Sequence, residues 1–223
     1  MTPRLAILPM LLTTACTTIY TYPTDEDPQH GPAQPGDPDE PDDPGTPDDP
    51  GTPGEPSVHL VFATSTLYQG GYLGGLDGAD AACAKQAKVG NLSGTFKAWL
   101  SDDTTAAADR LTHGTTPYVL VGGTRIADDW ADLTRADLQH EIDTDETGKL
   151  LPPPANMMIG GAVWTGSEFD GFQYTGGGYQ TCGGWHDPRG SGLTGDYLQR
   201  DGRWTLRSGL PCTSKAALYC IQQ

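Results

Sequence analysis

The fold of this chain is decided by Gly78–Val89, which reads GADAACAKQAKV, and by Thr95–Leu100, which reads TFKAWL. In a helix over the first segment, small side chains and one Gln recur at three- and four-residue spacing and share one face: Ala79, Ala82, Cys83, Gln86 and Ala87. Asp77 is expected to cap this helix and Gly90 to end it. The second segment is rich in residues that favour strands, and we expect a strand there.

Further elements lie on both sides of this pair. Val58–Ala63 predicts a strand, because Val58, Leu60 and Phe62 alternate with other residues and share one face. Downstream we expect a short helix at Thr105–Arg110 capped by Ser101 or Asp102, a hairpin of Tyr118–Val121 with Thr124–Ile126 across Gly122-Gly123, and later strands at Ala162–Thr165, Tyr179–Cys182, Arg203–Leu206 and Ala217–Ile221. Two helices, short antiparallel strands and long loops predict an α+β domain over 57–223.

The charge of the chain is unevenly distributed. The 223 residues carry a formal net charge of −16, and 11 of the 29 acidic residues lie in 25–56, where there is no Lys or Arg. The other 18 acidic and 12 of the 13 basic residues lie in 57–223, which gives this part a net charge of −6. Because binding to nucleic acid phosphates needs a basic face, the composition argues against a nucleic-acid partner.

The segment 16–56 has the composition of a disordered stalk. It is rich in Asp, Glu, Pro, Gly and Thr, and the unit DDPGTP at 42–47 is repeated at 48–53. Each Pro fixes its own φ and favours an extended conformation in the residue before it, while like charges repel along the chain. We therefore expect a solvated spacer here without a packed core.

The N-terminus has the layout of an export signal. Arg4 precedes an apolar run at 5–12, small residues follow at 13–15, and Cys16 comes next. The sequence around Cys16 resembles the lipobox of bacterial lipoproteins, although Thr13 stands where Leu or Val is usual. The resemblance implies a signal peptide at 1–15, acylation of Cys16 and anchoring in a membrane, which we expect to be the outer membrane with display at the cell surface. Simple secretion is the alternative.

The cysteine count agrees with export and lipidation. The chain has five cysteines, and acylation of Cys16 would leave Cys83, Cys182, Cys212 and Cys220 in the folded part. An oxidising compartment makes two disulfides the expected state. Four cysteines allow three pairings, and the spacing does not select one of them.

Several segments in order along the chain carry a family resemblance. Those at Gly78–Cys83, Leu92–Ser101, Val163–Ser167, Cys182 with Trp185, and Cys212 with Leu218–Ile221 resemble the endostatin domain of collagens. A family of bacterial exported lipoproteins of unknown function is more similar still, and shares Val61–Ser65, Thr112-His113 and Asp129–Leu133. Both families resemble the C-type lectin-like fold. The match spans nearly all of 58–223 and implies an endostatin-like domain.

The resemblance implies two nested disulfides, Cys83–Cys220 between the first helix and the last strand, and Cys182–Cys212 in the long-loop region. It does not bring the known ligand sites with it. The zinc site of endostatin uses a His cluster, whereas His59 stands alone here, and its heparin surface is Arg-rich, whereas this domain is acidic. Trp185-His186-Asp187 resembles one calcium-lectin triplet at a different place in the chain. We therefore expect no cofactor, no metal and no heparin binding.

Three acidic or polar segments remain as candidate sites. Trp185, His186, Asp187 and Arg189 follow Cys182 in a Gly-rich stretch and suit sugar stacking or polar recognition, although Trp185 could instead pack beneath the loop. Asp143–Gly148 begins like an EF-hand loop but has Pro154 where the bidentate Glu belongs, so a polar turn is the favoured interpretation and a weak calcium site the alternative. Asp128, Asp129 and Asp132 are expected to begin a short helix around a core Trp130.

No catalytic pattern stands out. The histidines are isolated, and the sequence has no nucleophile elbow, paired-carboxylate motif or metal-ligand spacing. The leading hypothesis is therefore a non-enzymatic binding module, such as an adhesin, that takes a protein or a glycan and is displayed on a stalk. A structural envelope lipoprotein is the alternative, followed by a hydrolase whose site is assembled in space.

Overall fold

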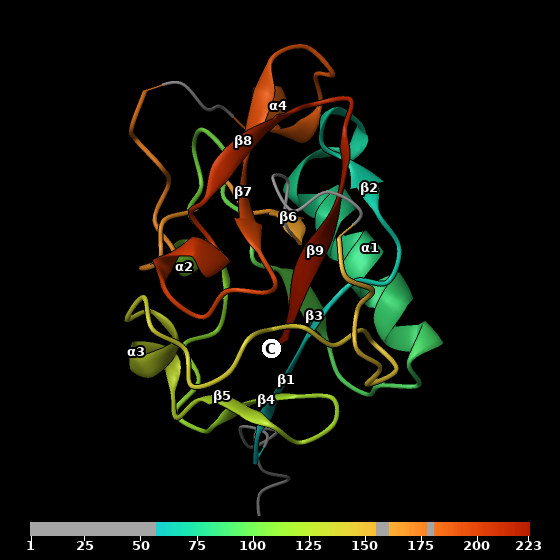
Figure 1. Ribbon diagram of the computed structural model, residues 1–223, viewed down its shortest axis with the longest axis vertical. Coiled ribbons are helices and arrows are strands. Elements are labelled where there is room, and N and C mark those ends of the chain that lie inside the picture. Colours follow the sequence, from blue (N-terminus) through green and yellow to red (C-terminus); the bar gives the residue numbers. More distant parts are fainter. Residues whose placement is uncertain (1–56, 155–160, 178–180) are drawn as a thin grey trace, which may run out of the picture. The chain divides into compact units, whose positions relative to one another are not determined.

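The computed structural model describes residues 57–154, 161–177 and 181–223. The expected signal peptide at 1–15, Cys16 and the stalk at 16–56 lie outside the described residues, as does the first half of the strand expected at Tyr179–Cys182. The described part is a mixed α/β domain with few helices and a core formed mostly by one sheet (Figure 1).

The sheet is built around its last strand, β9 (Lys215–Gln222). The order across the sheet is β5-β4-β1-β9-β6-β7-β8, and β2 and β3 also pair with β9. The other strands are β1 (His59–Ala63), β2 (Tyr68–Gln69), β3 (Phe96–Ala98), β4 (Tyr118–Leu120), β5 (Arg125–Ala127), β6 (Ala162–Trp164), β7 (Ser191–Asp196) and β8 (Ser208–Pro211). β9 therefore holds both halves of the domain together.

β9 is central because both of its faces are apolar. Ala217, Tyr219 and Ile221 belong to one core cluster, and Ala216, Leu218 and Cys220 belong to the other. Successive side chains of a strand point to opposite faces, so a continuous apolar run predicts a strand covered on both sides. Helix α1 (Gly75–Val89) contributes Ala79, Cys83 and Ala87 to the second cluster and lies alongside β9 in Figure 1.

The helices other than α1 are single turns. They are α2 (Ala107–Arg110), α3 (Trp130–Leu133) and α4 (Cys182–Trp185), with short 3₁₀ segments η1 (Gly70–Tyr72) and η2 (Gly202–Trp204). Asp129 accepts a hydrogen bond from the backbone N–H of Asp132 and caps α3, as the acidic pattern predicts, and Trp130 is half-buried against the core. Among the described residues, no helix is long and apolar enough to cross a membrane.

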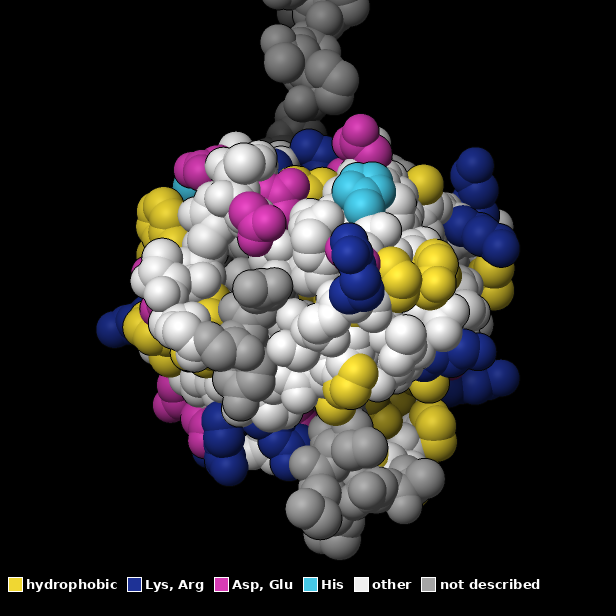
Figure 2. All heavy atoms as spheres, turned by 90° about the horizontal axis from the view of Figure 1, so that it is seen from above, with side chains coloured by type: hydrophobic (Ala, Val, Ile, Leu, Met, Phe, Trp, Pro, Cys, Tyr) yellow, Lys and Arg dark blue, Asp and Glu magenta, His cyan; other side chains and the backbone are white. Residues whose placement is uncertain are grey.

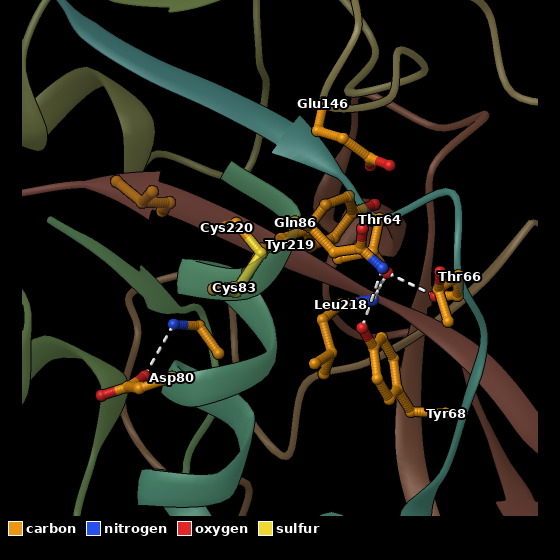
Figure 3. Close-up of a disulfide and its surroundings, with 12 residues drawn as sticks. Thr64, Thr66, Tyr68, Asp80, Cys83, Gln86, Glu146, Leu218, Tyr219 and Cys220 are labelled. Carbon is orange, nitrogen blue, oxygen red and sulfur yellow. Dashed lines mark hydrogen bonds between the residues drawn. A yellow bond between two sulfur atoms is a disulfide. The ribbon is translucent and has the colours of Figure 1, made fainter. Parts of the chain in front are cut away.

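Both predicted disulfides are present with the pairing that the resemblance implies. Cys83–Cys220 joins α1 to β9, and Cys182–Cys212 joins α4 to the segment after β8. Figure 3 shows Cys83–Cys220 beside buried polar groups that bond to one another: Gln86 donates to the Tyr68 hydroxyl at 3.0 Å, and the Thr64 hydroxyl accepts from the Leu218 N–H. Polar groups beside this disulfide therefore have partners within the protein.

Two charged side chains, one on α1 and one on α2, also hold β3 in place. The Asp80 carboxylate on α1 accepts from the Ala98 N–H at 2.8 Å, and Arg110 donates to the Ala98 carbonyl at 2.7 Å. Asp80 and Arg110 pair with each other at 2.5 Å. Both backbone groups of one β3 residue are therefore paired with side chains, which fixes α1 against the sheet.

Several sequence predictions are wrong in detail. α1 begins at Gly75 and its N-cap is Gly74, so Asp77 lies within the first turn and does not cap it. α2 is shorter than expected and follows Ala106, although the Ser101 hydroxyl does accept from the Ala107 N–H. The strands are not all antiparallel, because β1 pairs with β4, and β6 with β9, in parallel.

The region after residue 181 differs most from the prediction. In place of the strand expected at Arg203–Leu206 there is η2, where the Asp201 side chain accepts from the Arg203 N–H. Cys182 begins α4 and does not end a strand. β7 and β8, which were not predicted, form an antiparallel pair from Ser191↔Pro211 to Thr194↔Ser208. The strands at β1, β3, β6 and β9 and the β4–β5 hairpin agree with the prediction.

Candidate functional site

α4 is a left-handed turn. Cys182, Gly183, Gly184 and Trp185 have φ values of 52°, 57°, 63° and 68°. The Trp185 N–H donates to the Thr181 carbonyl at 2.6 Å, and the His186 N–H to the Cys182 carbonyl at 3.1 Å. Glycine adopts this conformation readily, whereas it costs about 1–2 kcal/mol for each L-residue with a side chain. The strain therefore falls on Cys182 and Trp185.

Both strained residues are anchored. Cys182 is held by its disulfide to Cys212. Trp185 is fully buried, packs edge-on against Trp164 with ring centroids 5.7 Å apart, and donates from Nε1 to the Ser101 carbonyl at 2.9 Å. A buried aromatic side chain contributes several kcal/mol, more than the strain removes. Trp185 is a core residue that packs beneath the loop, which is the structural alternative that the sequence left open for it.

The Asp187–Arg189 pair follows the turn at the surface. Arg189 donates to both carboxylate oxygens of Asp187, with Nε at 2.9 and 3.0 Å and a terminal nitrogen at 2.6 Å. The side-chain hydrogen bonds from Arg189, together with its backbone N–H, lower the pKa of Asp187 to about 2. The guanidinium group and the carboxylate form an ion pair, so these two predicted ligand residues bind one another.

His186, the fourth predicted residue, is exposed and lines a depression of about 420 Å³. The other lining residues come from the start of α1, from the loop after β3 and from the left-handed turn: Gly74, Gly75, Leu76, Asp77, Asp102 and Gly184. The depression therefore forms where three segments far apart in the sequence meet. Of these lining residues, only His186 was predicted from the sequence to bind a ligand.

Two glycines allow α1 and the turn to approach each other. The Gly74 N–H donates to the Trp185 carbonyl at 3.2 Å. A Cβ on Gly75 would lie 2.7 Å from Nε2 of His186, so the imidazole ring packs directly on the backbone of Gly75. Gly74 and Gly75 also have positive φ values of 81° and 78°, which favour glycine. The Gly74-Gly75 pair is the sequence signal that could have predicted this close approach of α1 and the left-handed turn.

The polar side chains of this depression are largely unengaged. Asp77 and His186 form no side-chain hydrogen bond within the described residues, and Asp77 lies in the first turn of α1. Asp102 uses one oxygen to accept from the backbone of Thr104 and Thr105, both at 2.8 Å. We call the depression lined by Asp77, Asp102 and His186 the His186 pocket. It can accept hydrogen bonds through its carboxylates and donate or accept one through its imidazole.

A second depression of about 460 Å³ lies beside α3, lined by Asp128, Asp129, Ala131, Asp132 and Arg135. Its carboxylates have intramolecular partners. Asp132 accepts from the Asp128 N–H at 3.0 Å and from Gln139 at 2.9 Å, and Arg125 donates to Asp128 at 2.7 Å and lowers the pKa of Asp128. This depression is the weaker candidate because its acidic groups already stabilise the fold.

The segment that begins like an EF-hand forms a polar turn, as favoured from the sequence. Asp145 accepts from the backbone N–H groups of Thr147 and Lys149 and from the Thr147 hydroxyl. The Glu146 carboxylate is buried and accepts from the backbone and hydroxyl of Ser65. In the described ranges, no three His, Cys, Asp or Glu residues are grouped so that they could hold a metal ion.

Figure 2 shows the end of the domain that lies at the top of Figure 1, where α4 is located. Acidic, basic and apolar side chains lie there in small separate groups among uncharged polar and backbone atoms. The individual exposed apolar residues of the domain include Tyr72, Leu150 and Phe172. On this face, recognition would depend on individual polar groups and not on one dominant charge.

Comparisons with known proteins give no identification. No protein-family model matches the chain, and no curated protein sequence matches it.

Proposed function

We propose that this protein is an exported lipoprotein whose domain at 57–223 is a non-enzymatic binding module for a protein or glycan. In this proposal Cys16 carries the lipid, the acidic stalk at 16–56 separates the domain from the outer membrane, and the domain acts at the cell surface, as an adhesin does. The disulfides support an oxidising compartment, because they are rare in the cytosol.

The observation that carries the binding assignment is the His186 pocket. Its two least engaged side chains, Asp77 and His186, come from different elements and face the same depression without forming hydrogen bonds within the described residues. The carboxylates beside α3, by contrast, accept hydrogen bonds from the protein itself. Unengaged groups in a concave site are available to the hydroxyl, amide or ammonium groups of a ligand.

The finer fold assignment is part of the same proposal. We infer an endostatin-like, C-type lectin-like domain, and the nested disulfides that join α1 to β9 and α4 to the segment after β8 support it. The segments Gly78–Cys83 and Leu92–Ser101, which carry the resemblance, lie within α1 and around β3. Fold analogy supports the scaffold only, and the ligand must come from the site.

The partners of the buried hydroxyl groups support the non-enzymatic assignment. Ser101 and Ser167 bond to each other at 2.7 Å, and the Thr205 hydroxyl accepts from the Trp99 indole. The lining of the His186 pocket contains no Ser, Thr or Cys. An activated nucleophile needs a base within hydrogen-bond reach, and these hydroxyls have structural partners instead.

Binding tests on the full lipidated chain would examine this proposal. The protein in detergent micelles is screened against a glycan array and a panel of matrix proteins, with calcium and with chelator. Asp77→Asn and His186→Ala are expected to weaken the detected binding at least tenfold. Asp109→Asn, which changes an exposed carboxylate in the first turn of α2, and His140→Ala are the matched controls and should retain it.

Two results would overturn the binding assignment. One is a full screen without signal above background, and the other is a ligand whose affinity is the same for the Asp77 and His186 variants as for their controls. Turnover of a substrate class that depends on His186 would favour the hydrolase instead. The anchor is tested separately by incorporation of a labelled fatty acid in cells, which Cys16→Ala should abolish.

A further inference from the structure

We propose that the Cys182–Cys212 disulfide is a redox-sensitive latch that holds α4 in its left-handed form and so maintains the wall of the His186 pocket. For its consequence on binding, this inference rests on the proposed function. For the conformational change itself, it rests only on the turn. The observation behind it is a run of four positive φ values whose two non-glycine residues are each fixed from outside the turn.

The two ends of the turn are fixed in different ways. At the first end, Cys182 is bonded to Cys212, with the two Cα atoms 5.6 Å apart. At the other end, Trp185 is fixed by burial against Trp164 and by its hydrogen bond to the Ser101 carbonyl. Only Gly183 and Gly184 lie between them. With both ends fixed, the turn has little freedom to leave the left-handed region, and when the disulfide opens one end is released.

The chemical step is thiol–disulfide exchange with a dithiol reductant. Both cysteines are buried, so the turn must first open locally to expose the pair. One thiolate of the reductant then attacks a sulfur of the pair and forms a mixed disulfide, and the second thiol of the reductant displaces the protein sulfur. The net change breaks the S–S bond, adds two electrons and two protons to give two thiols, and oxidises the reductant to its own disulfide. Cys182 can then return to a right-handed or extended backbone conformation.

The second disulfide keeps the domain folded during this change. Cys83–Cys220 lies between α1 and the central strand, and β9 is paired on both of its edges. The Cys182–Cys212 pair is also buried, but it joins a single left-handed turn to the segment that follows β8 and does not involve the central strand. Local opening free energies in proteins range from near zero to the global value. α4 is a single strained turn held by one disulfide and one buried ring, whereas β9 is paired with strands on both edges. Opening is therefore expected in α4 and not in the sheet.

The pocket depends on the position of this turn. Gly184 and His186 contribute to its lining, and the Trp185 carbonyl accepts from the Gly74 N–H at the start of α1. Release of the turn separates His186 from Gly75, on whose backbone its ring packs. Asp77 and Asp102 belong to other elements and stay in place. Reduction would thus remove one side of the pocket and leave the acidic side.

The test uses the full chain and a pair of glycine variants. Gly184→Ala adds a methyl group where no atom lies within 4 Å, so its effect is limited to the penalty for φ of +63°. This penalty exists only while the turn is left-handed. The variant is expected to shift the equilibrium with dithiothreitol toward the Cys182–Cys212 dithiol by about 5- to 30-fold. Gly123→Ala, at φ of +88° in the β4–β5 hairpin and equally without near atoms, is the matched control and should shift it by nothing measurable.

Hydrogen exchange follows the conformational change. In Cys182→Ser/Cys212→Ser, or after selective reduction, the Trp185, His186 and Asp187 amides should exchange at least tenfold faster, while amides of β9 keep their protection. Both disulfides opening together with loss of the sheet would overturn the proposal. Unchanged exchange at α4 in the double variant, or equal shifts for Gly184→Ala and Gly123→Ala, would overturn it as well. None of these measurements needs a ligand, so they fail or succeed independently of the binding screen.

Discussion

The two disulfides of this domain brace two different kinds of structure. Around Cys83–Cys220, a regular right-handed helix packs on a strand whose alternate residues fill two core clusters. Around Cys182–Cys212, four left-handed residues join short strands that are rich in glycine. The first region is stabilised by side chains that are buried at regular intervals along a helix and a strand. The second is stabilised by a few single contacts, namely the disulfide and the burial of Trp185. The difference explains why candidate binding groups lie beside the second region, where backbone shape is set by a few contacts.

Removal of the Cys83–Cys220 pair should have the largest effect and would test whether the first region carries the fold. The entropic model assigns ~5 kcal/mol to a loop closed across 137 residues and ~3.5 kcal/mol to one closed across 30. Cys83→Ser/Cys220→Ser is therefore expected to unfold the domain or to lower its free energy of unfolding by several kcal/mol, as measured by denaturant titration.

The matched double variant Cys182→Ser/Cys212→Ser provides the control for this prediction. It should keep a cooperative transition and lose less stability, because release of the left-handed strain offsets part of the lost cross-link. An equal or greater loss in this second variant would contradict the difference between the two regions.

Trp185→Ala tests the main non-covalent anchor of the second region. The substitution removes a fully buried indole and its hydrogen bond to Ser101, and we expect a loss of about 3–5 kcal/mol in the free energy of unfolding. Trp185→Phe should retain most of the packing and lose about 1 kcal/mol with the hydrogen bond. If Trp185→Ala left stability unchanged and abolished ligand binding only, the ring would be a recognition residue after all.

The regular region could be predicted from the sequence, because its pattern has a period. The apolar spacing of α1 and the continuous apolar run of β9 each indicate an element with a buried face, and both elements are found where expected. The pairing of the cysteines came from the resemblance and not from the spacing. The order of the strands could not be predicted from local sequence patterns, because it depends on contacts between distant segments.

Strand β7 could not be predicted because its two glycines serve packing and not turns. A Cβ on Gly192 would lie 2.8 Å from the Cys182 sulfur, and one on Gly195 would lie 1.9 Å from the Trp204 carbonyl. Both glycines are inside β7, where local propensity predicts a loop. The same limit applies to the site: His186 was found by its neighbours in sequence, whereas Asp77 and Asp102 join it only through the tertiary fold.

Gly75→Ala examines the contact between the two regions. The new methyl group would lie 2.7 Å from Nε2 of His186 and would occupy a φ of +78°. We expect a loss of about 1–2 kcal/mol from the backbone penalty, together with displacement of the imidazole ring. Gly123→Ala has the same backbone penalty without the contact, so it should match the stability loss and leave the His186 NMR signals unchanged. Unchanged His186 signals in Gly75→Ala would mean that the ring does not rest on α1.

Arg189→Ala should have the smallest effect, and it tests whether the surface after the left-handed turn is held by charge. Hydrogen bonds from Arg189 lower the pKa of Asp187 to about 2 from an ordinary 3.8, so the variant should raise this pKa toward 3.8 in a carboxyl NMR titration. A carboxylate with a lowered folded-state pKa contributes stability that is present above the unfolded value and is lost as the pH falls through the folded value. The contribution of this pair is therefore complete above about pH 4 and disappears toward pH 2 in the wild type. Because the pair is exposed, the difference in stability at neutral pH should be close to the limit of measurement.

Arg203→Ala, which removes the same kind of partner from Asp201, is the matched control and should leave the Asp187 titration unchanged. A low Asp187 pKa that persisted without Arg189 would show that the backbone of the turn, and not the ion pair, sets the local field.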